Sequence, residues 1–375
     1  MTILFKFVSI DTQSIFYPII EMRPVDLTES IFLKALRGEK TDRTPIWLMR
    51  QAGRYQKSYR EIREKVDFLT LCKTSELASQ VTVQAVDDLG VDAGIIFADI
   101  LLPLECLGSG LRFAKGDGPV LDNPIRLASD VDRLHPFEVE DGLGYVFESV
   151  RLFVKERASV PLIGFAGAPF TLASYLIEGG SSRHFERTKQ FMYQEPLAFK
   201  KLMSLLAGMT VDYLAGQARA GASCLMLFDS WVGCLSRQDF QAHVLPHSLE
   251  IFKALKSQLS GTPNIYFGTS TGTILDLMSQ AGSTALGVDW RIDVSEARRI
   301  TGIDRPVMGN LDPCLLLGPQ EELKRQAKLI LDDVGKKPGH IFNLGHGILQ
   351  HTPENNVRAL VDYVHEYSES FVNAR

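Results

Sequence analysis

Cysteine is scarce in this chain and never closely paired. Only five cysteines occur in 375 residues, and no two of them form a C-x-x-C pair. An odd count without such pairs argues against a disulfide framework and fits a reducing compartment. We therefore predict that all five side chains are buried as small hydrophobes: Cys72, Cys106, Cys224, Cys234 and Cys314.

Long apolar runs are also missing. No uninterrupted apolar stretch reaches the roughly 18 residues that a membrane-spanning helix needs. Residues 1–21 are mostly apolar, but Lys6 and Asp11 interrupt them, and neither a basic start nor a small-residue cleavage site indicates a signal peptide. We interpret residues 1–24 as an accessory extension, within which Met22 is an alternative start.

The chain has no excess of positive charge. Its 40 Lys and Arg residues are outnumbered by 45 Asp and Glu residues, which gives a net charge of -5, and there is no basic tail. This balance argues against nucleic-acid and membrane partners, so a polyanionic small molecule would have to bind in a locally basic cleft. We expect a cytoplasmic protein.

The sequence does contain eight short apolar runs separated by amphipathic segments, of which residues 195–220 and 236–259 are predicted to be helices. Near-continuous hydrophobicity in short runs is typical of parallel strands that are covered on both faces. Eight alternating units predict a (β/α)8 TIM barrel. The runs occupy residues 45–50, 93–99, 160–167, 224–230, 264–270, 284–290, 306–312 and 340–347.

No linker rich in proline, glycine or serine divides these units, so residues 25–375 are predicted to form a single barrel domain. The longest gap between runs, residues 100–159, follows the second strand and is interpreted as an insertion. It contains a predicted hairpin at residues 111–121, with its turn at 115–118, and a predicted helix at residues 144–156. Such an insertion is suited to wall a cleft.

Barrel enzymes carry their reactive groups at the C-terminal ends of the strands, and the polar residues of this chain follow that rule. Some of them are expected to cap helices or anchor loops instead, because Ser236 and Thr352 already show the pattern of helix caps. The polar strand ends are Arg50, Asp99, Asp229 with Ser230, Thr269 with Ser270, Asp289, Asn310 with Asp312, and His346.

The segment RQAGRY places Arg50 and Arg54 four residues apart, just after the first apolar run. A strand that leads into two arginines and a glycine is typical of a turn at a sheet edge, where guanidinium groups bind carboxylates or phosphates through paired hydrogen bonds. The alternative is a surface helix cap that carries solvated arginines. The segment alone leaves both interpretations open.

Asp99 stands in the segment AGIIFADILLPL, where its neighbours are apolar or small. A carboxylate buried there without partners would cost several kcal/mol, so it requires dedicated hydrogen-bond donors or a cationic ligand. Backbone amides or a nearby arginine are one solution. We favour a role that faces a ligand, because a lone aspartate in an apolar cleft suits a molecule with several N–H donors.

Three further side chains are weaker candidates. His346 lies between two glycines in NLGHGI, which are expected to let the backbone approach a bound molecule and leave the imidazole unobstructed. Tyr175 falls in a predicted first helical turn after the third strand, where core packing is the alternative. The hydroxyl of Ser230 either faces the cleft or caps its loop.

Six motifs in this order resemble the uroporphyrinogen decarboxylase family: RQAGRY, FADIL, GAPFTLASYLIEGGSS, FDSWVG, GNLDP and FNLGHGI. The resemblance covers nearly all of the chain from about Leu27 onward. It implies removal of CO2 from the four acetate side chains of uroporphyrinogen III, giving coproporphyrinogen III in haem and chlorophyll synthesis. It also implies that no cofactor takes part and that the protein is a homodimer.

The resemblance assigns roles by position. Arg50, Gln51, Ala52, Gly53 and Arg54 would form a substrate-binding loop, and Arg63 would bind a further carboxylate. Asp99 would be the central catalytic residue, while Tyr175, Ser230 and His346 would line the cleft. The chain departs from many relatives at Ala98, where they have serine, and from some at Ser230, where they have threonine.

Three other functions are alternatives. A zinc-dependent corrinoid or thiol methyltransferase of the same fold needs a thiolate-rich site, but the chain has no His-x-Cys spacing, and Cys224 and Cys234 lack a neighbouring histidine. A Schiff-base aldolase is poorly supported, because none of the eight runs ends in lysine. A non-catalytic tetrapyrrole carrier shares the same cleft, and only turnover separates it from an enzyme.

Overall fold

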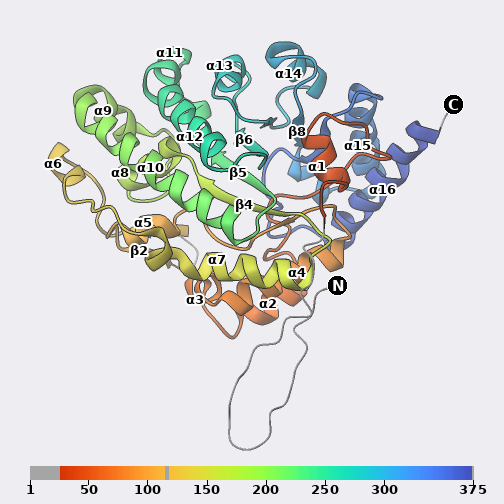
Figure 1. Cartoon of the computed structure of the whole chain (residues 1–375), viewed down its shortest axis with the longest axis horizontal. Helices are drawn as coiled ribbons and strands as arrows, with labels where there is room; N and C mark the ends of the chain where they lie inside the picture. The colour runs from red at the N-terminus through yellow and green to blue at the C-terminus, as the bar shows by residue number, and fades with distance from the viewer. Residues whose placement is uncertain (1–25, 115–117, 374–375) are drawn as a thin grey trace, which may run out of the picture.

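The computed structural model of the chain describes residues 26–114 and 118–373. Helices surround a ring of parallel strands, and the chain passes around this ring in sequence order (Figure 1). The extension predicted for residues 1–24 and most of the hairpin turn predicted at 115–118 lie outside the described residues.

Within the described residues, seven strands hydrogen-bond side by side in chain order, and all neighbouring pairs are parallel. Nearly every residue in them is buried, because helices cover the outer face and side chains fill the inside of the ring. The strands are β1 (Gly94–Ile95), β4 (Leu162–Gly167), β5 (Cys224–Asp229), β6 (Asn264–Gly268), β7 (Ala285–Gly287), β8 (Val307–Leu311) and β9 (His340–Leu344).

The first predicted strand, residues 45–50, closes the ring with only a short bridge. Ile46 pairs in parallel with Phe342 of β9, and on the other side its carbonyl accepts the N–H of Asp92 at 2.8 Å. The Ile46 N–H donates to the carboxylate of Asp92 at 2.8 Å, so a side chain replaces part of the strand ladder. The predicted (β/α)8 barrel is confirmed, although this run is not a regular strand.

Helices connect the strands and form the outer layer. The predicted helix at residues 195–220 is confirmed as α10 (Pro196–Ala220). Apart from those in residues 236–259, the other helices and helical turns outside the insertion are α1 (Ile31–Leu36), α2 (Lys57–Arg63), α3 (Phe68–Lys73), α4 (Ser75–Leu89), α8 (Pro169–Glu178), α9 (Glu186–Gln194), η1 (Val232–Cys234), α13 (Leu275–Gln280), α14 (Val294–Thr301), η3 (Pro313–Leu317), α15 (Gln320–Val334) and α16 (Glu354–Asn373).

The helix predicted at residues 236–259 is interrupted. It consists of α11 (Arg237–Asp239), a π-helical turn η2 (Phe240–Val244) and α12 (Leu245–Gln258). Pro246 stands at the start of α12, and because proline has no N–H it cannot continue the regular i to i−4 bonding of the preceding turn.

The insertion after β1 contains α5 (Leu102–Cys106), the antiparallel hairpin of β2 (Leu111–Ala114) and β3 (Gly118–Leu121), α6 (Ala128–Val131) and α7 (Val139–Glu156). The predicted hairpin and helix are therefore confirmed. The hairpin packs against the loop that follows α8, where Val120 bridges to Gly180 and the Leu121 N–H donates to the Gly179 carbonyl at 3.0 Å. This loop leads directly to the cavity described below.

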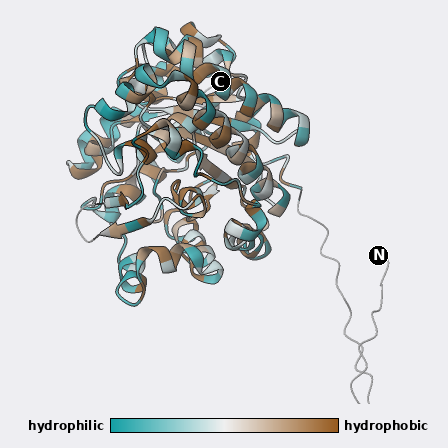
Figure 2. Ribbon diagram, turned by 90° about the vertical axis from the view of Figure 1, so that its left-hand side faces the viewer, coloured by the Kyte–Doolittle hydropathy of each residue, from teal (hydrophilic) through white to brown (hydrophobic). Residues whose placement is uncertain are grey.

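Buried apolar side chains form one large cluster that includes the strands and the inner faces of the helices. Hydrophobic residues dominate the interior and hydrophilic residues the outer helix faces (Figure 2). No helix among the described residues has the length and apolar character that crossing a bilayer requires. The prediction of five buried cysteines is wrong: Cys72 and Cys224 are buried, whereas Cys106 and Cys234 are partly exposed and Cys314 is exposed.

The two predicted helix caps have different outcomes. Ser236 caps α11, and its hydroxyl oxygen accepts the Asp239 N–H at 3.1 Å. Thr352 does not behave as predicted, because its hydroxyl is buried and makes no hydrogen bond with any described residue.

Candidate active site

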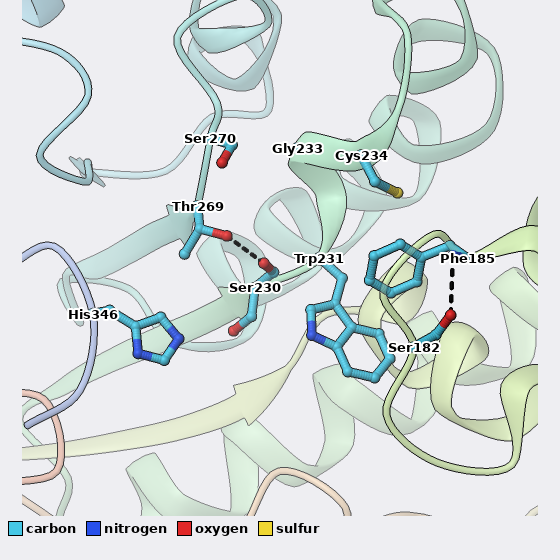
Figure 3. A pocket seen from close by; sticks show the side chains of 9 residues that line it. All are labelled: Ser182, Phe185, Ser230, Trp231, Gly233, Cys234, Thr269, Ser270 and His346. Atoms are coloured by element: carbon cyan, nitrogen blue, oxygen red, sulfur yellow. Dashed lines mark hydrogen bonds between the residues drawn. The ribbon is translucent and has the colours of Figure 1, made fainter. Parts of the chain in front are cut away.

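Loops from several strand ends surround a cavity of about 400 Å³. Figure 3 shows His346 on one side of it and Phe185 with Ser182 on the other, with Ser230 and Trp231 between them. The lining residues follow α8, β5, β6 and β9, so the cavity lies where barrel enzymes bind their ligands. They are Ser182, Phe185, Ser230, Trp231, Gly233, Cys234, Thr269, Ser270 and His346.

Asp99 follows β1 and is half-buried. Its carboxylate accepts the Leu101 N–H at 2.8 Å and has no other hydrogen-bond partner in the described part of the chain. Burial raises the pKa of Asp99, whereas the Leu101 N–H and the positive charge of Arg50 act in the opposite direction. The second carboxylate oxygen is therefore available to donors on a ligand.

Arg50 is exposed and has a positive φ of 63°, which is unusual for a residue with a side chain. Its side chain passes directly over Gly347: a Cβ at that glycine would lie 2.6 Å from the Arg50 Cγ. The charge of Arg50 acts on three other candidates, because it influences the pKa of Asp99, Tyr175 and His346. The arginine thus lies near these three side chains.

His346 is held as a neutral imidazole. Burial, together with the charge of Arg50, lowers its pKa to about 4. The flanking glycines allow the side chains of Trp290 and Arg50 to approach the backbone closely, and the imidazole itself lines the cavity. A Cβ at Gly345 would lie 2.7 Å from Trp290 Cε3, just as one at Gly347 would collide with Arg50. The glycines therefore admit protein groups rather than open space.

Tyr175 lies one turn further into α8 than predicted and is half-buried. Its ring stacks on Trp231 with a centroid separation of 3.8 Å and an interplanar angle of 30°. Burial raises the pKa of the phenol, and the negative charge of Asp99 raises it further. The phenol is therefore protonated at neutral pH and can donate a hydrogen bond.

Ser230 follows β5 and lines the cavity. Its carbonyl accepts the hydroxyl of Thr269 at 2.5 Å, which ties the loops after β5 and β6 together. The preceding residue, Asp229, is fully buried and accepts hydrogen bonds from Thr171 at 2.8 Å and Tyr266 at 3.0 Å. Burial raises the pKa of Asp229 to about 6. Because its partners are themselves fully buried, this carboxylate belongs to the scaffold beneath Ser230.

The loop that carries Arg50 and Arg54 is fastened from inside. Gln51 is fully buried, and its side chain accepts the Leu48 N–H at 3.3 Å and donates to the Ala93 carbonyl at 3.4 Å. Ala52 packs against a small apolar cluster, and the Gly53 N–H donates to the Gln56 side chain at 3.2 Å. The side chain of Arg54 is exposed.

Arg63, at the end of α2, is half-buried and lies away from the cavity lining. It donates to the Val66 carbonyl and lies over the ring of Phe68, 5.8 Å from its centroid. Phe68 in turn contacts Phe97, two residues before Asp99, at a centroid distance of 6.0 Å. Arg63 thus borders the approach to Asp99 without touching the carboxylate.

The structure brings Arg50, Asp99, Tyr175 and His346 into one electrostatic neighbourhood, with Ser230 across the cavity. Sequence reasoning did not select Ser182, Phe185, Trp231 or Cys234. In the sequence, apolar or small lining residues look like ordinary core or loop residues. What marks this region is the backbone conformation in the structure. Among the described residues, the non-glycine positive φ values occur at Arg50, Phe185 and Ser270, all of which border this region.

Ser270 and Asp312 illustrate strand-end residues that serve the scaffold. The Ser270 N–H donates to Asp289 at 2.6 Å, and Asp312 caps η3 by accepting the Cys314 N–H at 2.9 Å. No group of three or more His, Cys, Asp or Glu side chains within residues 26–114 and 118–373 is arranged to hold a metal ion.

Similarity to solved structures is consistent with the barrel. A methyltransferase from Methanosarcina mazei superimposes with a TM-score of 0.76, covering 91% of this chain and 99% of that one, at 18% sequence identity. At this sequence identity, the similarity shows a shared fold and does not show a shared activity.

Curated relatives are much more similar. The chain is 51% identical to uroporphyrinogen decarboxylase of Carboxydothermus hydrogenoformans over 90% of its own length and 96% of the relative's. It is also 51% identical to that of Sorangium cellulosum, over 89% and 95% of the two chains. The model of the family "Uroporphyrinogen decarboxylase (URO-D)" matches residues 27–367. The chain therefore belongs to the uroporphyrinogen decarboxylase family.

Proposed function

We propose that this protein removes the four acetate carboxyl groups of uroporphyrinogen III as CO2 and leaves methyl groups in their place, which gives coproporphyrinogen III. The observation that supports this most is the setting of Asp99. Its half-buried carboxylate has a free oxygen and lies beside Arg50 and Tyr175, in a chain 51% identical to proteins named for this reaction.

Binding follows from the charges of the substrate. Uroporphyrinogen carries carboxylates around its rim, and its four pyrrole N–H groups converge at the centre. Arg50 and Arg54 bind rim carboxylates through charge-assisted hydrogen bonds, on a loop whose shape depends on Gln51, Ala52 and Gly53. Arg63, at the end of α2, binds a further carboxylate. Asp99 accepts the pyrrole N–H groups, for which an acceptor-only carboxylate is the complementary partner.

The remaining side chains bind the substrate in neutral form. Because its pKa is lowered to about 4, His346 is uncharged at neutral pH and serves as a hydrogen-bond partner rather than an acid. Tyr175 donates its phenol proton as a hydrogen bond, and the Ser230 hydroxyl does the same across the cavity.

The chemistry requires an electron sink for the bond that breaks. A proton first adds to the pyrrole ring carbon beside the acetate, which makes the ring cationic. The bond to the carboxylate then breaks, CO2 leaves, and the electron pair neutralises the ring. A proton adds to the exocyclic carbon while the ring proton is lost, so each methyl group consumes one proton. Asp99 stabilises the cation through its fixed negative charge, and no cofactor enters this scheme.

The proton donor is Arg50, Arg54, Tyr175 or water. His346 is a poor candidate, since its lowered pKa leaves almost no imidazolium at neutral pH. A substrate with ¹³C in its acetate carboxyls tests the reaction directly. It should release four labelled CO2 molecules per macrocycle, and in D2O each new methyl group should carry one deuterium. Absence of labelled CO2 would refute the proposed function.

We also propose that residues 25–375 act as one catalytic domain, with residues 1–24 accessory to it, and that the protein is a cytoplasmic homodimer. Deletion of residues 1–24 should leave turnover unchanged, whereas a large loss would contradict the accessory role. Sedimentation velocity should give twice the 41.8 kDa mass of one chain, and a monomer would contradict the dimer.

A further inference from the structure

Trp231 lies at the centre of a column of three aromatic rings beside the cavity. One neighbour is Tyr175, at a centroid distance of 3.8 Å, and the other is Phe185, at 4.9 Å. Figure 3 shows the indole and the Phe185 ring side by side in the cavity wall. The column connects a proposed substrate-binding phenol to the loop after α8.

The backbone of Trp231 is fixed by a buried polar network. Its N–H donates to the Thr171 hydroxyl at 3.3 Å, and that hydroxyl donates to Asp229 at 2.8 Å. Thr171, Asp229 and Tyr266 are fully buried, and the Tyr266 phenol donates to the other oxygen of Asp229 at 3.0 Å. Three residues, from α8, the end of β5 and the middle of β6, therefore hold the backbone that carries the indole.

The outer ring of the column is fixed as well. Phe185 adopts a positive φ of 53°, which costs energy for a residue with a side chain, and its N–H donates to the Ser182 hydroxyl at 3.0 Å. The ring of this residue lies against Trp231 at an interplanar angle of 55°.

Tyr175 has no comparable anchor of its own. Its hydroxyl makes no hydrogen bond with any described residue, although Asp99 and Arg50 both act on its pKa. Helix α8 fixes the Cα but leaves rotation about the side-chain bonds, so the stack with Trp231 is what orients the ring. An aromatic pair of this kind changes a rotamer population by about twofold to about tenfold.

We propose that Trp231 is a positioning residue that holds the Tyr175 phenol toward Asp99 and Arg50, and that Asp229 and Thr171 hold Trp231 in turn. The inference rests on the proposed function, because Tyr175 acts on the substrate only there. It assigns Trp231 no contact with the reacting atoms. Its effect on turnover must therefore pass through the hydroxyl of Tyr175.

A double-mutant cycle separates this role from general support of the fold. Trp231→Leu should lower kcat about twofold to tenfold in the wild-type background, and Trp231→Phe, which keeps a ring in the column, should restore most of it. In the Tyr175→Phe background, where the hydroxyl is gone, Trp231→Leu should lower kcat no further.

Equal losses in both backgrounds would overturn the inference, and so would an unchanged kcat for Trp231→Leu in the wild-type background. Thr171→Val is a second perturbation that keeps the indole. It should lower kcat less than Trp231→Leu does, and it should not lower kcat in the Tyr175→Phe background. The cycle can therefore be completed even if the Trp231→Leu protein folds poorly. The matched control is Tyr363→Leu, which breaks the stacked pair with Tyr367 on α16 at 5.5 Å and should leave kcat unchanged.

Failure of the proposed function would look different. Wild-type protein that releases no CO2 from uroporphyrinogen III refutes the function itself. Normal wild-type turnover combined with additive losses in the cycle refutes only the positioning role of Trp231.

Discussion

Asp99→Asn tests the electrostatic core of the proposed mechanism. The substitution keeps an acceptor oxygen for the Leu101 N–H, now 2.8 Å from the carboxylate, but removes the negative charge. Two unit charges about 4 Å apart at an effective dielectric constant of about 20 attract each other by about 4 kcal/mol, which corresponds to about a thousandfold in rate. Because Asp99 is half-buried, some screening remains, and we expect kcat to fall about 100- to 1000-fold.

The fold should tolerate this substitution. Burial raises the pKa of Asp99, which means that the ionised carboxylate is disfavoured in the folded protein, so its removal should leave the melting temperature equal or slightly higher. Asp312→Asn is the matched control, because Asp312 makes the same local bond, to the Cys314 N–H at 2.9 Å, outside the cavity lining. A near-normal rate for Asp99→Asn, measured by chromatography of the oxidised porphyrins, would refute the reasoning.

Three further predictions concern neighbouring features. Gly347→Ala should displace Arg50, whose Cγ lies 2.6 Å from the added Cβ, and should lower kcat/KM about 10- to 100-fold with an unchanged melting temperature; an unchanged kcat/KM would contradict this. Protonated Asp99 lacks the negative charge that stabilises the ring cation, so kcat/KM should fall as pH drops through its raised pKa, and this acid limb should be absent in Asp99→Asn; its persistence there would assign the limb to another group. Burial alone would raise the pKa of Asp92, but its bonds to His365, the Ile46 N–H and Arg43 outweigh burial and lower it. Its stabilisation is therefore present above pH ~4 and lost as pH falls through the lowered pKa, so Asp92→Asn should reduce the free energy of unfolding by about 3 kcal/mol at pH 7 but not in strong acid; equal reductions at both would refute the linkage.

The barrel was predictable because parallel strands that are buried on both faces are nearly continuous apolar runs in the sequence. The prediction was less accurate where local chemistry replaces the regular pattern. Residues 45–50 look like a strand, but the Asp92 carboxylate takes over part of the hydrogen bonding of Ile46. The helix at residues 236–259 contains a π-helical turn because Pro246 provides no N–H, which is a consequence of one residue inside an otherwise helical pattern.

The candidate site was predictable where a polar residue stands among apolar or small neighbours in the sequence. Asp99 among apolar residues and His346 between two glycines are such cases. Trp231 and Phe185 do not stand out in this way, because aromatic residues usually belong to the core, and only the positive φ of Phe185 and the contact between the two rings distinguish them. The glycine at 347 makes room in the structure for the side chain of Arg50, and nothing in the sequence indicates this contact.

The most direct test of the central claim is an anaerobic incubation of the purified protein with uroporphyrinogen III in EDTA, followed by chromatographic counting of carboxylates on the oxidised products. We predict a ladder from eight carboxylates to four. Substrate that stays bound but unchanged would contradict it and favour a tetrapyrrole carrier, whereas substrate that is neither bound nor changed would contradict it and return attention to the methyltransferase chemistry found elsewhere on this fold.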